Sequence, residues 1–216
     1  MKVQSCEMGS SNSCSTVVQT LVAQRDAYRL AIRVAAVLLV TALTAAAAQV
    51  SVPLPFTQVP LTFQPMVVLL GGLFLGSGLG LASQALYLMA GVAGLPVFAA
   101  SATLPPGAWR LIGPTGGYLM SYPIATFLVG YLAERGFDRR YVTSLLAMLA
   151  GLVVVYGGGV AWLGLFARSS AEAAPIGLQA ALVSGVYPFV VADLVKLVAA
   201  AGILPGLWKL FGRLER

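Results

Sequence analysis

The sequence predicts an all-α integral membrane protein, a bundle of six transmembrane helices with both termini in the cytoplasm. Of the 216 residues, 59% are hydrophobic and 9% are charged, whereas a soluble domain carries roughly a quarter charged residues. The apolar residues fall into runs that approach the roughly 20 residues needed to cross a bilayer. Arginine and lysine gather before the first run, at 135–140 and after 208, and basic residues mark the cytoplasmic side of a membrane.

The chain divides into a polar tail over 1–24, a membrane domain over 25–205 and a basic cytoplasmic tail over 206–216. Within the membrane domain we expect six spans, at about 30–48, 65–78, 80–97, 116–133, 142–166 and 178–204. Glycines in the long second run predict a tight inner turn near 77–80. The basic clusters account for the net charge of +6, so no basic face is left to bind nucleic acid.

The first apolar run, 34–48, also resembles a signal peptide, because it ends in a stretch of alanines. The polar region before it is too long for an ordinary signal peptide, and cleavage would place the basic C-terminus outside. We therefore expect a retained helix. Small residues recur on it at Ala27, Ala31 and Ala35, a spacing that lets another helix approach closely. That second helix could belong to this chain's own bundle or to a partner subunit.

Residues 49–65 contain four prolines and no charge. Proline interrupts a regular helix, and apolar irregular backbone is tolerated at membrane depth only where protein covers it or where it lines a cavity. We interpret this segment as a lid or re-entrant loop on the outer side. Arg110 is the only charged residue between Arg33 and Glu134. It is either an interfacial anchor beside Trp109 or a contact for an anionic ligand at the mouth of a pocket.

The last span contains two charged residues, Asp193 and Lys196. An ionised side chain in the hydrocarbon core is costly, so it usually faces a protein interior or a water-filled cavity. Their spacing of three places both on nearly the same helix face. The pair either fixes helix packing or binds a small ligand, with Asp193 accepting N–H bonds and Lys196 meeting a carbonyl or carboxylate. Apolar parts of such a ligand would be covered by aromatic side chains, namely Phe63, Phe98 and Trp109.

Several classes of chemistry are excluded by residues that the sequence lacks. It contains no histidine, which removes most zinc sites and the usual general bases. It contains no Walker A motif, so the chain itself does not couple ATP hydrolysis. Its cysteines, Cys6 and Cys14, both lie in the polar tail and are expected to be free cytoplasmic thiols. We therefore expect neither an enzyme nor a resident cofactor.

The chain resembles the BioY family in four stretches that occur in the family's order and spacing: VPLPFTQVPLTFQP, AGVAGLPVFA, GPTGGYL and YPFVVADLVKLVAAA. This family comprises the biotin-binding S components of energy-coupling factor (ECF) vitamin transporters. The resemblance covers about residues 30–205. It implies a six-helix S component in a prokaryotic cell membrane that binds biotin from the outside and delivers it inward. Its partners would be a transmembrane T component and ABC-type ATPases, although some family members are thought to act alone.

The resemblance also implies site residues. The family's aspartate and lysine of the last helix fall on Asp193 and Lys196, and its polar lid residues fall on Thr62 and Gln64. The tyrosine of GPTGGY is Tyr118. The alanine spacing of the first helix is similar to the pattern by which S components dock on the T component, which favours docking over internal packing.

This chain departs from the family pattern at 99–108, where many members are rich in glycine, and at Leu119, where some members have arginine. The residue that meets the biotin carboxylate is therefore either Arg110 or Lys196. Two alternatives stay open: an S component for a different vitamin, and a less favoured membrane enzyme that acts on a lipid-like substrate with Asp193 as its base.

Overall fold

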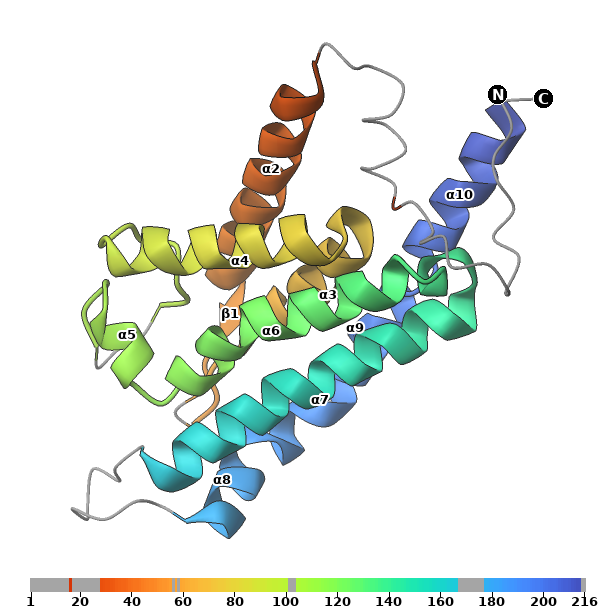
Figure 1. Cartoon of the computed structure of the whole chain (residues 1–216). Helices are drawn as coiled ribbons and strands as arrows, with labels where there is room; N and C mark the ends of the chain where they lie inside the picture. The colour runs from red at the N-terminus through yellow and green to blue at the C-terminus, as the bar shows by residue number, and fades with distance from the viewer. Residues whose placement is uncertain are drawn as a thin grey trace.

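The computed structural model describes residues 16, 28–55, 57, 59–100, 104–166 and 177–214 of a mostly helical chain (Figure 1). Its helices and strands are, in order, α2 (Arg29–Gln49), β1 (Ser51–Val52), β2 (Leu61–Thr62), α3 (Gln64–Leu75), α4 (Ser77–Val92), α5 (Trp109–Ile112), α6 (Gly116–Ala133), the short 3₁₀ helix η2 (Phe137–Arg139), α7 (Tyr141–Leu165), α8 (Leu178–Gly185), α9 (Tyr187–Ala200) and α10 (Ile203–Leu214).

Helix α6 is the central helix of the bundle and packs against α7, α3 and α4 (Figure 1). Glycine makes this close packing possible. A Cβ atom added at Gly117 would lie 2.3 Å from the carbonyl oxygen of Gly158 on α7, closer than real Cβ atoms approach. Near the other end of α6, a Cβ atom at Gly130 would lie 2.3 Å from the carbonyl carbon of Gly76. Small residues at such crossings let helix backbones pack closely within a membrane.

The turn between α3 and α4 is a single residue, Gly76, one position before the stretch 77–80 that the sequence predicts. Its φ of +84° and ψ of −179° form a conformation that is essentially open to glycine only. Glu134, which follows α6, caps the N-terminus of α4. Its carboxylate accepts hydrogen bonds from the backbone N–H of Ser77 at 2.9 Å and from the Ser77 hydroxyl at 3.0 Å. A carboxylate at a helix N-terminus also complements the helix dipole, so this inner turn is fastened to α6.

The segment predicted as the last span, 178–204, is divided in the structure. Helix α8 ends at Gly185, Val186 has a non-helical φ of −123° and ψ of −58°, and α9 begins at Tyr187. Pro188 lies in the first turn of α9, where its missing N–H costs little and its fixed φ suits a helix start. After Ala200 the chain forms a further helix, α10, over most of the stretch that the sequence predicts as a cytoplasmic tail.

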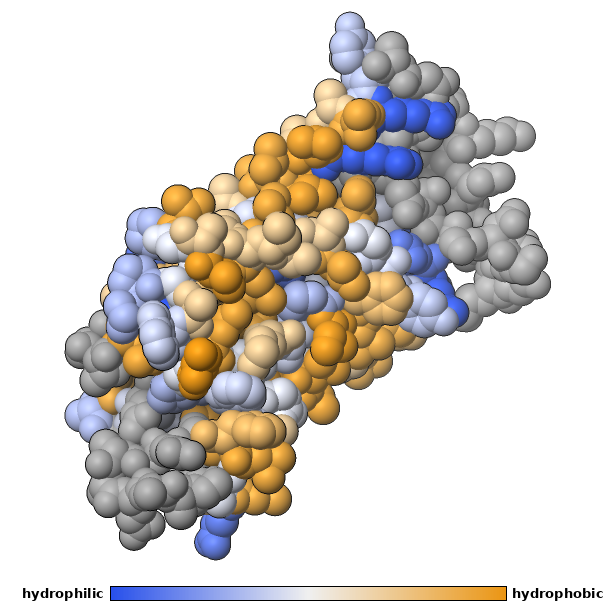
Figure 2. Space-filling model, turned by 60° about the vertical axis from the view of Figure 1, so that its left-hand side comes forward, coloured by the Kyte–Doolittle hydropathy of each residue, from blue (hydrophilic) through white to orange (hydrophobic). Residues whose placement is uncertain are grey.

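Three helical segments of the described residues are long and apolar enough to cross a membrane, namely Arg29–Gln49, Tyr141–Leu165 and Tyr187–Leu210. Other predicted spans correspond to shorter helices, such as α3 with 12 residues and α4 with 16. Hydrophobic side chains cover much of the face shown in Figure 2, and the most hydrophilic ones lie toward its ends. Large apolar surfaces of this kind mark contact with lipid or with another protein.

The proline-rich segment contains a short antiparallel hairpin at the outer end of the bundle. Strand β1 pairs with β2, with Ser51 opposite Thr62. Thr57, in the connection between the strands, donates its hydroxyl to the carbonyl oxygen of Ser184 on α8 at 2.8 Å. Gln49, at the end of α2, donates to the carbonyl oxygen of Pro96 at 3.1 Å. These bonds fix both the hairpin and the helix that leads into it to neighbouring segments.

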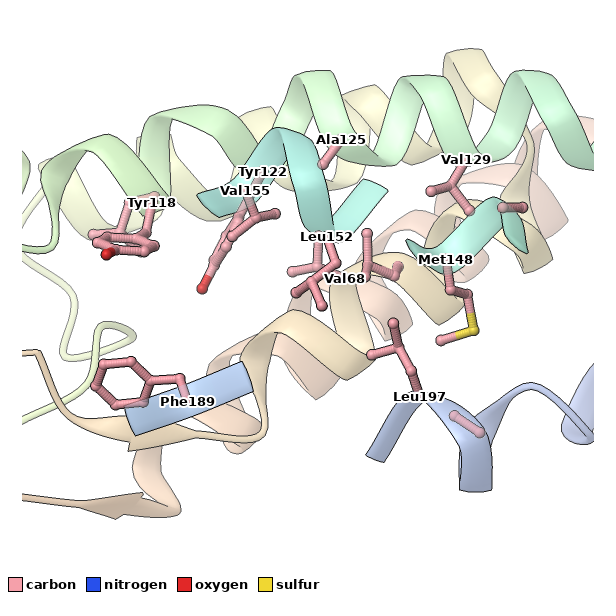
Figure 3. Close-up of a cluster of buried hydrophobic side chains, with 14 of the residues drawn as sticks. Val68, Tyr118, Tyr122, Ala125, Val129, Met148, Leu152, Val155, Phe189 and Leu197 are labelled. Carbon is pink, nitrogen blue, oxygen red and sulfur yellow. The ribbon is translucent and has the colours of Figure 1, made fainter. Parts of the chain in front are cut away.

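The hydrophobic core fills the inner half of the bundle. Figure 3 shows buried side chains of α3, α6, α7 and α9 meeting there, each at most 4% exposed: Val68, Ala125, Val129, Met148, Leu152 and Leu197. Toward the outer end the same cluster gives way to the aromatic rings of Tyr118, Tyr122 and Phe189 (Figure 3). The bundle is therefore closed by tight packing on its inner side.

We predict that Gly76→Ala destabilises the protein and that Gly78→Ala does not. An alanine Cβ at Gly76 would lie 2.7 Å from Oε1 of Glu134, whereas one at Gly78 would meet nothing within 4 Å. The strained backbone at Gly76 adds about 1–3 kcal/mol for a residue other than glycine. Gly78 is helical, so alanine there should be neutral or stabilising. Thermal unfolding of both variants in detergent tests this, and equal melting temperatures would contradict it.

Candidate functional site

A cavity of about 520 Å³ lies in the outer half of the bundle. Its walls come from the hairpin, the start of α3, the segment around α5, and helices α6, α7 and α9. Small-molecule sites are commonly 300–1,000 Å³ in volume and combine apolar walls with a few polar groups. The polar side chains on this wall are Thr57, Thr62, Gln64, Arg110, Thr115, Tyr118, Tyr122, Tyr156 and Asp193. The cavity therefore has the size and the composition of a site for a small ligand.

Asp193 is the acidic side chain on the cavity wall, and it is 3% exposed. Two helices hold its carboxylate. Tyr156 of α7 donates its hydroxyl to Oδ2 at 2.7 Å, and Nζ of Lys196 lies 2.9 Å from Oδ1. A counter-ion and a hydrogen bond together offset the cost of keeping a carboxylate out of water. Each carboxylate oxygen can accept more than one hydrogen bond, so Asp193 retains the capacity to accept from a ligand.

Lys196 is held beside Asp193 and does not line the cavity. Besides its bond to Asp193, its Nζ donates to the carbonyl oxygen of Thr62 on β2 at 2.7 Å. It also lies 5.0 Å from the ring centre of Phe63. Lys196 therefore neutralises Asp193 and fastens the hairpin to α9. The structure places it as the partner of Asp193 and not on the wall where a ligand would lie.

Thr62 and Gln64, the two polar residues predicted at the edge of the lid, both reach the cavity wall and are both buried. Gln64 Nε2 donates to the hydroxyl of Tyr87 at 2.6 Å, and that hydroxyl donates to the carbonyl oxygen of Val97 at 3.1 Å. The Thr62 hydroxyl donates to Oε1 of Gln64 at 3.4 Å. This series of bonds joins the hairpin, α4 and the segment before α5, and it holds one wall of the cavity in shape.

Arg110 and Trp109 are adjacent in sequence but have different surroundings. Arg110 is 9% exposed and lines the cavity, and it donates from Nε to Pro105 O at 3.0 Å and from Nη1 to Ala99 O at 2.9 Å. Trp109 is 61% exposed and is not part of the cavity lining. Successive residues of a helix face different directions, and α5 turns only one of these two inward. Phe63, predicted with Trp109 to cover a ligand, is also largely exposed and outside the lining.

The charge of Arg110 is not compensated by a carboxylate in the part of the chain that the structure describes. Burial lowers the pKa of its guanidinium from the usual value, but arginine stays protonated at neutral pH. Asp193, in contrast, is neutralised by Lys196. The cavity therefore presents an acceptor at Asp193 whose charge Lys196 balances, and a positive charge at Arg110 that no described carboxylate balances.

The BioY family model matches residues 17–213 of the chain. The chain belongs to the BioY family. A protein of Thermotoga maritima named "Biotin transporter BioY" is 38% identical over 170 residues, which are 79% of this chain and 92% of that protein. A "Probable biotin transporter BioY" of Pyrococcus horikoshii is 42% identical over 167 residues, which are 77% of this chain and 90% of that protein.

A crystal structure of the S-component for biotin from an ECF-type ABC transporter has the same fold, with a TM-score of 0.69 and 26% sequence identity. The match covers 82% of this chain and 90% of that one. The predicted family and S-component fold are therefore confirmed. This BioY chain is a mostly helical, multi-pass membrane protein of a prokaryotic transporter family, and the prediction of a transport subunit rather than an enzyme is also confirmed.

Aromatic rings form much of the remaining wall in this BioY chain. Phe98, where the sequence predicts a ligand contact, packs edge-on against Tyr87 with ring centres 5.4 Å apart. Tyr118, also predicted, lines the cavity and donates its hydroxyl to the carbonyl oxygen of Gly185 at 2.7 Å. That bond fixes the break between α8 and α9. Across from Tyr118, the ring of Phe189 on α9 closes the other side (Figure 3).

Three further aromatic residues that the sequence does not predict as site residues line the cavity: Tyr122, Tyr156 and Phe189. Tyrosines are common at membrane interfaces as well as in pockets, so residue type alone did not separate the two roles. Spacing could have found two of them. Tyr122 follows Tyr118 by four residues and Phe189 precedes Asp193 by four, and residues four apart share a helix face. No sequence signal singles out Tyr156.

We predict that Lys196→Met lowers stability far more than the double change Asp193→Asn/Lys196→Met does. The single change leaves the Asp193 carboxylate buried without its counter-ion, and breaking a buried pair in this way costs about 3–5 kcal/mol. Removing both charges is better tolerated, because no ion is then left unpaired. Thermal unfolding of the two variants in detergent measures the difference. A single variant as stable as the double variant would show that the pair does not act as a buried ion pair.

Proposed function

We propose that this chain is the substrate-binding S component of an ECF-type transporter and that it binds biotin in the cavity. Its relatives named as biotin transporters and its likeness to a solved S-component for biotin support this assignment. The observation that carries the proposal is the chemistry of the cavity: a neutralised acceptor at Asp193, aromatic walls, and a guanidinium at Arg110. Biotin combines a ureido ring that donates N–H bonds, an apolar body and tail, and a carboxylate, so it complements all three.

The ureido end of biotin is assigned to Asp193. This carboxylate accepts N–H bonds from the ring, and bonds to an ionised acceptor are stronger than those between neutral groups. Tyr156 donates to one oxygen of this carboxylate and Lys196 to the other, and both bonds hold it in place. The acceptor is therefore in position before the ligand arrives, which lowers the cost of ordering side chains on binding.

The carboxylate end is assigned to Arg110 in preference to Lys196. Lys196 does not line the cavity, and its ammonium group is already bonded to Asp193 and to the Thr62 carbonyl oxygen. Leu119, where some BioY members have arginine, is a buried apolar part of the wall. Arginine has five N–H donors, and two of those of Arg110 are bonded to carbonyl oxygens. The remaining donors can bind a carboxylate, so in this chain the cation that meets it comes from α5.

The ligand enters from the outer side and leaves on the inner side in this proposal. The cavity lies under the hairpin and the segment around α5, whereas the packed core closes the inner half of the bundle (Figure 3). Inward delivery therefore requires a rearrangement of packed helices. The chain has no Walker A motif to drive it, so we assign the energy to ABC-type ATPases acting through a transmembrane T component.

Docking on the T component is assigned to the first half of α2. Ala31 and Ala35 are exposed there, while the fully buried residues of α2, such as Val40, Thr44 and Ala48, lie in its second half. Ala27, the third residue of the predicted docking pattern, lies outside the described residues. The exposed small side chains leave room for a helix of another subunit to approach closely.

The direct test is binding of labelled biotin to the full chain purified in detergent. Saturable binding is expected, with displacement by dethiobiotin, which retains the ureido ring and the carboxylate, and none by vitamins of unrelated structure. A folded chain that binds no biotin would overturn the proposal, and so would displacement by a different vitamin.

We predict that Asp193→Asn weakens biotin binding about 10- to 100-fold. A hydrogen bond to a charged group contributes about 1.5–3 kcal/mol, and each 1.4 kcal/mol is a factor of ten in affinity. Asp138→Asn is the matched control, because Asp138 is also buried but does not line the cavity. Titration with labelled biotin should find an unchanged affinity for Asp138→Asn. Equal affinities in all three proteins would remove Asp193 from the site.

We predict that Arg110→Ala weakens binding of biotin more than binding of biotinamide, whose carboxylate is replaced by a neutral amide. Because Arg110 also bonds to the carbonyl oxygens of Ala99 and Pro105, its loss should disturb the wall and affect both ligands somewhat. The difference between the two losses isolates the carboxylate contact, and about tenfold is expected for a charge-assisted bond. The same loss for both ligands would assign Arg110 to the structure of the wall alone.

A further inference from the structure

Nearly all polar side chains on the cavity wall are bonded to another group of the described chain. Tyr118 and Tyr156, for example, donate to Gly185 O and to Asp193. The exceptions are Thr115, which is partly exposed at the start of α6, and Tyr122. Tyr122 is 3% exposed, and its hydroxyl has no hydrogen-bond partner among the residues that the structure describes. The hydroxyl oxygen is not enclosed by protein: it borders the cavity, where a ligand can bond to it.

The Tyr122 hydroxyl lies at the depth of Asp193. Tyr118 and Tyr122 are one turn apart on α6, and Phe189 and Asp193 are one turn apart on α9. Both helices run from the outer end of the bundle to the inner end (Figure 1). Figure 3 shows Tyr118 across from Phe189, with the Tyr122 hydroxyl pointing into the space between α6 and α9. One turn deeper on each helix, Tyr122 therefore faces the level of Asp193, and both residues line the cavity.

A ligand that donates to Asp193 leaves its own acceptor unbonded unless the protein provides a donor beside the carboxylate. Paired with Lys196, the Asp193 carboxylate accepts hydrogen bonds and does not donate them. Lys196 does not line the cavity, and Tyr156 donates its one hydroxyl hydrogen to Asp193. Among the described residues of the lining, Tyr122 is thus the unbonded donor at this depth. In a cyclic urea the carbonyl oxygen lies between the two N–H groups. A protein donor, here the Tyr122 hydroxyl, beside a protein acceptor, here the Asp193 carboxylate, therefore matches the carbonyl oxygen and one N–H along the same edge of the ring.

We propose that Tyr122 is a ligand-binding residue whose hydroxyl donates a hydrogen bond to the ureido oxygen of biotin. This inference rests on the proposed function and adds a contact to the same site. It makes Tyr122 a residue that determines specificity, because a site with an unsatisfied donor discriminates against a ligand that lacks the matching acceptor. Analogues that retain the N–H groups but lose the oxygen should therefore bind poorly.

The test compares wild type, Tyr122→Phe and the matched control Tyr187→Phe. Tyr187 is 65% exposed and lies outside the cavity lining, so its change removes a hydroxyl without touching the site. Each full chain is titrated with biotin and with the thione analogue, in which sulfur, a weaker acceptor, replaces the ureido oxygen. Tyr122→Phe should lose about tenfold in affinity for biotin and little for the analogue. Tyr187→Phe should change neither affinity.

Unchanged biotin affinity in Tyr122→Phe would overturn the inference and leave the proposed function standing. An equal loss for biotin and for the thione analogue would overturn the assignment of the ureido oxygen. Should Tyr122→Phe fail to fold, the wild-type chain decides: no preference for biotin over the analogue would contradict a donor at this oxygen. A wild-type chain that binds no biotin at all would instead overturn the proposed function and this inference together.

Discussion

The carboxylate of Asp193 is the constraint on which the cavity depends. A charge buried within a membrane protein is tolerated only with a counter-ion and hydrogen bonds, and here these partners come from different parts of the chain. Lys196 comes from the same helix, Tyr156 from α7, and the Thr62 carbonyl that shares the Lys196 ammonium comes from β2. Satisfying one acidic side chain therefore ties α9, α7 and the hairpin together. The same bonds leave the face of Asp193 that borders the cavity open to a ligand.

A second constraint divides the bundle into a hollow half and a packed half. In the inner half, glycines such as Gly130 let helices meet backbone to backbone, and Glu134 fastens the α3–α4 turn to α6. In the outer half, large rings such as those of Tyr118 and Phe189 hold α6 and α9 apart, and the space between them is lined by polar groups. The residue sizes along the same helices thus create a site that opens toward one side of the membrane and is closed toward the other.

Much of this could be predicted from the sequence, because a membrane makes certain residues conspicuous. Asp193, Lys196 and Arg110 are rare charges in apolar surroundings, and the prolines of 49–65 exclude a helix, so the sequence singles out these residues and this segment. The rotation of a helix about its axis and the position of a break within a helix could not be predicted from the sequence. The rotation of α5 decides whether Trp109 or Arg110 faces inward. For Tyr122, residue type alone does not distinguish a pocket tyrosine from one at the membrane interface. The break at Val186 depends on long-range contacts such as that of Tyr118 with Gly185.

The pattern of satisfied and unsatisfied groups also limits the class of ligand. Asp193 is neutralised by Lys196, whereas Arg110 has only carbonyl partners among the described residues, so the cavity as a whole favours an anion. A cationic vitamin would meet this guanidinium and would find no free carboxylate among the described residues of the wall, which opposes its binding. A neutral ligand would leave the Arg110 donors unmatched. Only a molecule with N–H donors at one end, an apolar middle and an anionic group at the other satisfies Asp193 and Arg110 at once.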